Sequence, residues 1–201
     1  MSEEKKKRNS IDVRPVLDRL AQFHPQLFGA RFVPLKLGIF HDLMAAHPDA
    51  FTKEELKAAL GVHARSTRYL EAVASGTKRH DIDGQPVEDV SPDHVHHAIM
   101  EVFRRRQSRS KQDLRPWVID RLVRAIDSSG LLRDEYFERV SAKDDESLAL
   151  LQEAFAEIAA RRAKREAVWR AYEASGKSVE EFAQMYGMTS AEVRAAIGEP
   201  A

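Results

Sequence analysis

Four cations and one aromatic ring lie close together in the segment that runs from Arg65 to Gly84. The five residues are Arg65, Arg68, Tyr69, Lys78 and Arg79. An arginine guanidinium binds a phosphate through two parallel hydrogen bonds, and a tyrosine ring can stack on a nucleobase. The grouping therefore predicts a nucleic-acid site. The alternative is that Tyr69 belongs to the core and Arg68 to a surface ion pair.

A lysine and a glycine stand at the start of a predicted helix in the segment VPLKLGIF. A first helical turn accepts Pro34, so Lys36 is expected beside the backbone N–H groups that this turn leaves unpaired. Such groups attract anions, and Gly38 would let a backbone ligand approach closely. A phosphate contact at Lys36 is therefore predicted, with an ordinary exposed lysine as the alternative.

Two further lysines, Lys53 and Lys57, lie one helical turn apart. They could follow neighbouring phosphates, or they could pair with nearby glutamates. Residues 1–112 hold 19 Lys and Arg against 15 Asp and Glu, whereas the rest of the chain holds 13 against 17. A polyanion site is therefore expected in the N-terminal half.

The elements that must position these side chains are predicted to be mainly helical. Apolar spacing and capping signals predict helices over 11–24, 34–46, 52–60, 64–75 and 91–107, and a hairpin over 78–90 that turns at Asp83-Gly84. Gly61 is expected to end the third helix. Arg65 and Tyr69 are expected one turn apart on the same face of the fourth helix.

The C-terminal part is predicted to be all helical. A long apolar pattern covers residues 144–174, and capping boxes open two short helices between residues 178 and 197. This last pair has helix-turn-helix spacing, but its second helix offers a single basic residue, Arg194. Packing or partner binding is therefore favoured over DNA reading.

The composition excludes several kinds of site. The 201 residues include no cysteine, which excludes disulfides, zinc–thiolate sites and cysteine nucleophiles, and the formal net charge is zero. We see no secretory or membrane-spanning apolar segment, so a cytoplasmic protein with no membrane partner is expected. Residues 1–10 are expected to form a disordered basic arm.

Candidate catalytic and metal-binding groups are few. His94 and His97 lie one helical turn apart, but no third ligand is indicated, so a surface or packing role is expected. The turn of the hairpin accounts for Asp81 and Asp83. The sequence has no glycine-rich phosphate loop, nucleophile elbow or HExxH motif, so we expect neither an enzyme nor a cofactor.

Residues from about 11 to 103 resemble the ProQ/FinO family of bacterial RNA-binding proteins. The likeness rests on segments that share the order and spacing of the family: RPVLDRLAQFHPQLF, PLKLGIFHDL, FTKEELKAAL, TRYLEAV and GTKRHDIDGQPV. Residues 113–201 match no family extension. The resemblance implies a compact, mainly helical fold with a small β-hairpin and a concave basic face.

The resemblance also implies an RNA chaperone. Its partners would be structured RNAs, above all terminator stem-loops with uridine-rich 3′ ends, and it would stabilise small RNAs or promote their pairing with messengers. The residues implied in RNA contact are Lys36, Lys57, Arg68, Tyr69 and Arg79, with Lys53 and Arg65 as weaker candidates and Gly38 as a point of close approach. The neighbouring cation Lys78 is added to this set.

The expected organisation is therefore a basic arm over 1–10, an RNA-binding domain over 11–110 and a helical extension over 111–201. Two other functions stay open. The terminal helix pair could make the chain a DNA-binding transcriptional regulator. The C-terminal helices could instead bind a protein partner or associate with a second copy of the chain.

Overall fold

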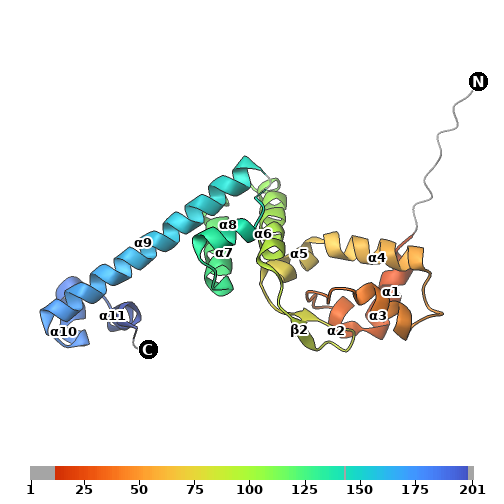
Figure 1. Cartoon of the computed structure of the whole chain (residues 1–201), viewed down its shortest axis with the longest axis horizontal. Helices are drawn as coiled ribbons and strands as arrows, with labels where there is room; N and C mark the ends of the chain where they lie inside the picture. The colour runs from red at the N-terminus through yellow and green to blue at the C-terminus, as the bar shows by residue number, and fades with distance from the viewer. Residues whose placement is uncertain (1–11, 143, 199–201) are drawn as a thin grey trace, which may run out of the picture. The chain divides into compact units, whose positions relative to one another are not determined.

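The computed structural model describes residues 12–142 and 144–198 (Figure 1). Residues 1–10, for which the sequence predicts a basic arm, lie outside the described residues. The described residues divide into two compact units on either side of residue 143. The mainly helical fold with one small hairpin is as predicted.

The first unit holds both strands and eight of the helices described: α1 (Arg14–Phe23), α2 (Pro25–Phe28), α3 (Ile39–Ala46), α4 (Lys53–Arg65), α5 (Thr67–Ala74), β1 (Arg79–His80), β2 (Pro86–Glu88), α6 (Pro92–Gln107), α7 (Arg115–Ser129) and α8 (Arg133–Arg139). The second unit holds α9 (Asp145–Ser175), α10 (Val179–Tyr186) and α11 (Ser190–Ile197). None of the described helices is long and apolar enough to span a membrane.

Capping boxes confirm the predicted starts of α4, α10 and α11. At α4, the Thr52 hydroxyl accepts a hydrogen bond from the Glu55 N–H at 3.2 Å, and the Glu55 carboxylate accepts one from the Thr52 N–H at 3.1 Å. This exchange satisfies two backbone N–H groups that the first helical turn would otherwise leave unpaired.

The predicted end of a helix at Gly61 is wrong. Helix α4 continues through Gly61 to Arg65, because the buried His63 holds its last turn against the rings of Phe28, Phe32 and Tyr69. The break comes at Ser66, whose hydroxyl accepts a hydrogen bond from the Tyr69 N–H and caps α5. Arg65 and Tyr69 therefore lie on different helices rather than on one face of a single helix.

The predicted helical turn at Pro34 is also wrong. Leu35 forms a parallel bridge with His80, and α3 begins only at Ile39. Gly38 ends the extended stretch with φ of 84°, a backbone angle that glycine adopts without strain. Lys36 therefore lies in a loop beside the hairpin, and not in the first turn of a helix.

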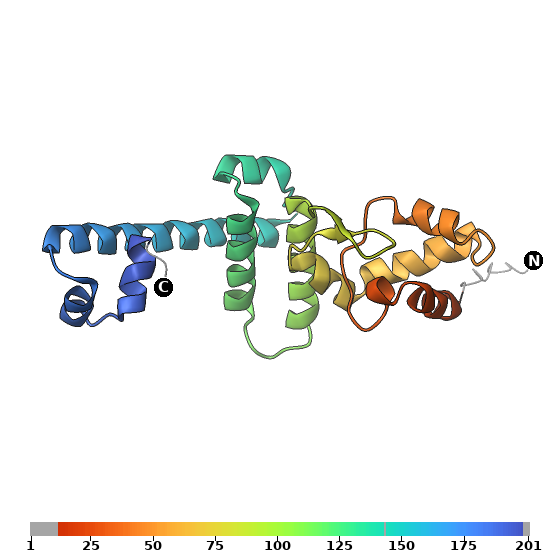
Figure 2. The ribbon, with the colours of Figure 1, turned by 90° about the horizontal axis from the view of Figure 1, so that it is seen from below.

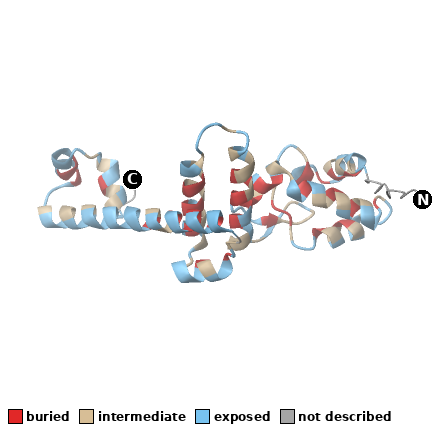
Figure 3. Ribbon diagram, turned by 90° about the horizontal axis from the view of Figure 1, so that it is seen from above, coloured by how far each residue is buried: buried red, intermediate tan, exposed pale blue. Residues whose placement is uncertain are grey.

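The core of the first unit is centred on α6. Figure 2 shows α6 and α7 lying side by side as a helical hairpin, and Figure 3 shows buried residues along both helices. Ile99 and Leu122 are among the fully buried side chains. The contact between these helices carries the unit past residue 110, the expected end of the RNA-binding domain, to Ala142.

The hairpin is anchored to the helical part of the first unit by a pair of histidines. His24 Nδ1 lies 2.9 Å from the Ile82 carbonyl oxygen, and its Nε2 lies 2.9 Å from His47 Nε2. A carbonyl oxygen only accepts, so Nδ1 of His24 carries a proton, and one of the two facing Nε2 atoms donates to the other. Burial, and then the charge of His24, lower the pKa of His47.

The second unit has a small core of its own. Val179, Phe182 and Ala183 of α10 and Val193 of α11 are buried together, and Tyr172 of α9 packs against them. The middle of α9, over residues 159–167, is exposed on every side (Figure 3). This part of α9 is held by its own backbone hydrogen bonds and by ion pairs such as Arg161–Glu157.

Candidate nucleic-acid interface

The loop that carries Lys36 is fixed to the hairpin by its backbone. The His80 N–H donates to the Pro34 carbonyl and the Lys36 N–H donates to the His80 carbonyl, each at 2.8 Å. Leu37 also has its N–H engaged, at 2.9 Å from a Glu88 carboxylate oxygen. The N–H groups of Lys36 and Leu37 are therefore occupied, so the expected anion site on free helical N–H groups is absent here.

Tyr69 and Arg79 hold the same loop from its inner side. The Tyr69 hydroxyl accepts a hydrogen bond from the Leu35 N–H at 3.1 Å, and Arg79 Nη1 donates to the Leu35 carbonyl at 3.0 Å. The second Arg79 nitrogen, Nη2, lies 2.9 Å from His94 Nδ1. Only 8% of Tyr69 and 6% of Arg79 is exposed, so both residues position the loop through its backbone.

Tyr69→Phe tests this positioning role. The ring remains, but the Leu35 N–H loses its buried acceptor, which we expect to lower the free energy of unfolding by about 1–2 kcal/mol. RNA affinity should fall as the loop loosens, and Tyr69→Ala should cost more of both. Chemical denaturation and RNA titration of the two variants measure these effects. Unchanged stability in Tyr69→Phe would contradict the positioning role.

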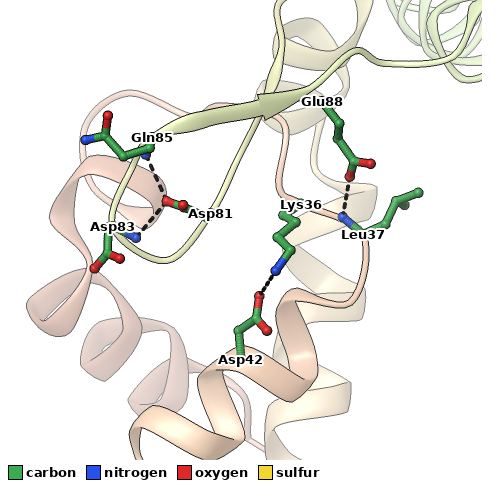
Figure 4. Close-up of polar contacts among 7 residues, drawn as sticks. All are labelled: Lys36, Leu37, Asp42, Asp81, Asp83, Gln85 and Glu88. Carbon is green, nitrogen blue, oxygen red and sulfur yellow. Dashed lines mark hydrogen bonds and ion pairs between the residues drawn. The ribbon is translucent and has the colours of Figure 1, made fainter.

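Lys36 lies among acidic side chains (Figure 4). Its ammonium is 2.9 Å from Asp42, and the hydrogen bond and charge of Asp42 raise its pKa, with smaller contributions from Asp81 and Glu88. Lys36 is therefore firmly protonated, and its side chain is more than a third exposed. It can offer its remaining donors to a phosphate while Asp42 orients it.

The two aspartates of the hairpin serve its turn, as predicted. The Asp81 carboxylate accepts hydrogen bonds from the Asp83 N–H at 3.0 Å and from the Gln85 N–H at 2.9 Å (Figure 4). Gln26 of α2 donates to the Asp83 carbonyl at 2.8 Å. The turn is thereby fixed from inside and from the helical side.

A groove of about 520 Å³ lies between α5 and α6 and is here named the α5–α6 groove. Leu70, Val73 and Ala98 give it an apolar lining. Three of the predicted site residues line it, together with two histidines and one arginine that the sequence did not assign: Arg65, Tyr69, Arg79, His94, His97 and Arg105. Cations beside an apolar wall can hold a phosphate and the ring of a nucleotide together.

Arg105 ties the two sides of this groove together. Its guanidinium donates to the Arg65 carbonyl at 2.8 Å and pairs with Glu101 at 3.4 Å. The sequence signal that could have found Arg105 is its position in the basic run at the end of α6. His94 and His97 line the same groove, and the described residues contain no group of three or more potential metal ligands.

The other predicted residues lie outside the α5–α6 groove. Arg68 lies over the ring of Phe32, 4.5 Å from its centroid, and donates to the Ala30 carbonyl. Lys53 and Lys57 are exposed on α4, and Gly38 caps α3. Lys78 pairs with Asp89 at 3.4 Å and lines a separate groove beside the hairpin, of about 620 Å³, with Arg31.

The terminal helix pair gives little support to DNA reading. Helices α10 and α11 have the predicted arrangement, with Gly187 ending α10. The single basic residue of α11, Arg194, pairs with Glu180 of α10 at 2.7 Å. Its charge is therefore largely neutralised within the pair.

Comparison with known proteins adds independent information about the first unit. Residues 11–115 match the sequence model of the ProQ/FinO family. The chain is 36% identical over 91 residues to a protein named RNA chaperone ProQ from Shewanella oneidensis, and these residues cover 43% of each of the two chains. It is 36% identical over 93 residues to the protein of the same name from Shewanella frigidimarina, covering 44% of this chain and 46% of the relative. The match thus spans less than half the length of either relative.

Two solved structures are also similar. One is a FinO-like RNA chaperone from Neisseria meningitidis, with 32% identity, 43% of this chain and 88% of the other covered, and a TM-score of 0.39. The other is a ProQ homolog from Legionella pneumophila, with 30% identity, 57% and 99% covered, and a TM-score of 0.41. The family match covers more than half of the present sequence. Through residues 11–115, this chain belongs to the ProQ/FinO family.

Proposed function

We propose that the chain is a non-enzymatic RNA chaperone that binds structured RNA through its first unit. The observation that carries this proposal is the convergence at one loop of Lys36, Tyr69 and Arg79, which come from distant parts of the sequence. Family membership of the same residues supports it. A-form RNA hides its base edges in a deep groove, so scattered cations suit the reading of its phosphates and shape.

The proposed ligand is a terminator-like stem-loop with a uridine-rich 3′ tail. A stem presents phosphates to Lys36 and to the exposed lysines of α4, while the α5–α6 groove has room and apolar surface for an unpaired nucleotide. In the cell, such binding would stabilise small RNAs and messengers or promote their pairing. A cytoplasmic location is part of the same proposal.

The test compares one hairpin with and without its uridine tail, titrated with the full chain. We expect the tailless hairpin to bind on the order of tenfold more weakly, because the loss of one or two stacked, charge-contacted nucleotides removes contacts of this size. Lys57→Gln should weaken both RNAs alike, since its contact is with the stem. Equal affinity for the two hairpins would contradict recognition of the 3′ end.

A further inference from the structure

A second groove in the first unit, of about 590 Å³, is here named the α7–α8 groove. One wall is formed by the end of α5 and the start of α6, and the other by α7 and α8. Helix α8 and all of the lining residues of α7 lie beyond residue 115, where the family match ends. This groove therefore combines the family domain with a part of the chain outside it.

Three arginines line this groove: Arg121, Arg124 and Arg139. Arg121 contacts the ring of Trp117 at 5.6 Å from its centroid, and Arg139 makes no ion pair with any residue that the structure describes. Arg124 pairs with Asp120 at 2.8 Å, but its side chain is 72% exposed, so its remaining N–H donors are open to a ligand. Among the described residues, Arg121 and Arg139 thus have no carboxylate partner, and Arg124 has one but stays exposed to solvent.

The opposing negative charge is small. Asp89 is the single acidic residue in the described lining of the groove, and it already pairs with Lys78 at 3.4 Å. The remaining lining is apolar or uncharged and includes Val90, Val95 and Ser128. A concave surface that carries three arginines against one paired aspartate favours an anion, and the guanidinium fork fits phosphate geometry in particular.

The position of the groove indicates a phosphate chain rather than a lone anion. Helices α5 and α6 line both this groove and the α5–α6 groove. On α6, His94 lines the α5–α6 groove, and the next residue, Val95, lines the α7–α8 groove. An RNA held in the α5–α6 groove therefore has a neighbouring basic surface within the same unit. Two arginines three residues apart on α7, with a third on α8, can contact successive phosphates of one strand.

We propose that the α7–α8 groove binds the phosphate backbone of a single-stranded RNA segment that adjoins the stem-loop. This inference rests on the proposed function, because the strand reaches the groove from the α5–α6 groove. It assigns to part of the chain beyond residue 115 a direct role in RNA binding. Arg124 and Arg139 supply the principal contacts, and Arg121 supports them from its place beside Trp117.

The test uses the full chain and the double variant Arg124→Gln/Arg139→Gln, which leaves the Arg121–Trp117 contact intact. Two RNAs are titrated: the tailed hairpin, and the same hairpin with a longer single-stranded 3′ tail. The double variant should bind the short hairpin like the unchanged protein and the extended RNA on the order of tenfold more weakly. For the extended RNA, the slope of log affinity against log salt concentration should become less steep by about 1.4–1.8. The lower value applies if the two lost contacts are with a single strand, and the higher value if they are with a duplex.

The matched control is Arg162→Gln/Arg165→Gln in the exposed middle of α9, which removes the same charge from residues of the second unit that do not line the groove. Equal losses in the two double variants, or an unchanged slope for the groove variant, would overturn the proposal. A third result would also overturn the proposal: polyglutamate binds the unchanged protein but not the groove variant, and the two proteins have the same RNA affinity. The groove would then bind an acidic protein.

The isolated single strand separates this proposal from the proposed function. If the unchanged protein fails to bind either hairpin, the proposed function fails. A single strand that still binds, and that loses affinity in the groove variant, would then leave the groove as a phosphate site. A single strand that binds both proteins equally would overturn it.

Discussion

Arg79→Gln should lower the free energy of unfolding by about 2–4 kcal/mol and weaken RNA binding on the order of tenfold or more. The Arg79 side chain is buried, and it donates to the Leu35 carbonyl and lies within hydrogen-bonding distance of His94. Glutamine is too short to reach both partners, so a buried carbonyl loses its donor. The loop that presents Lys36 then loses one of its side-chain supports and keeps those from Tyr69 and Glu88.

The matched control is Lys78→Gln, which removes the same charge from the neighbouring, exposed position. It should leave the free energy of unfolding within about 0.5 kcal/mol of the unchanged protein, since isolated surface ion pairs contribute little. Both variants are compared by denaturant unfolding, and by RNA titration at a temperature where each is folded. If Arg79→Gln lost no more RNA affinity than Lys78→Gln, the result would contradict a role in RNA binding for the contact between Arg79 and Leu35.

Acid should destabilise the first unit through His63, by about 3 kcal/mol between pH 6.5 and pH 4. Burial among the rings of Phe28, Phe32 and Tyr69 lowers the pKa of His63 from 6.5 to about 4. The unfolded chain therefore takes up a proton at this residue near pH 6.5, whereas the folded chain resists it until about pH 4. The stabilisation is complete above pH 6.5 and is lost as the pH falls towards 4.

His63→Leu removes this titration while keeping an apolar side chain of similar size. The free energy of unfolding of the unchanged protein minus that of the variant should fall by about 3 kcal/mol from pH 7 to pH 4. Other groups with shifted pKa values, such as His47, affect both curves alike. A constant difference for His63→Leu would refute the assignment.

Local signals in the sequence predicted most of the fold. The capping boxes at Thr52, Ser178 and Thr189 mark helix starts that depend only on neighbouring residues, and the structure confirms all three. The errors occur where distant contacts override local preference. Gly61 lies within a helix because His63, two residues later, is buried among rings from three other segments.

The same distinction explains what could be predicted of the candidate site. Residue types and the family resemblance singled out Arg65, Tyr69 and Arg79, and the structure shows that these three residues line one groove. No spacing rule could show that Tyr69 and Arg79 would bind the two backbone groups of Leu35, since that requires the bridge between Leu35 and His80. The sequence indicated His94 only through its spacing of one helical turn from His97. In the structure, its hydrogen-bond partner is Arg79, fifteen residues earlier.

The attachment of the Leu35 loop through main-chain atoms has a consequence for how this protein could diverge. Hydrogen bonds to a peptide group are indifferent to the side chain attached to it, so the loop keeps its shape when its outward residues change. Leu37, which is 61% exposed, is the nearest such residue. Leu37 also lines the α5–α6 groove, so its replacement would change the surface of that groove while the framework stays intact.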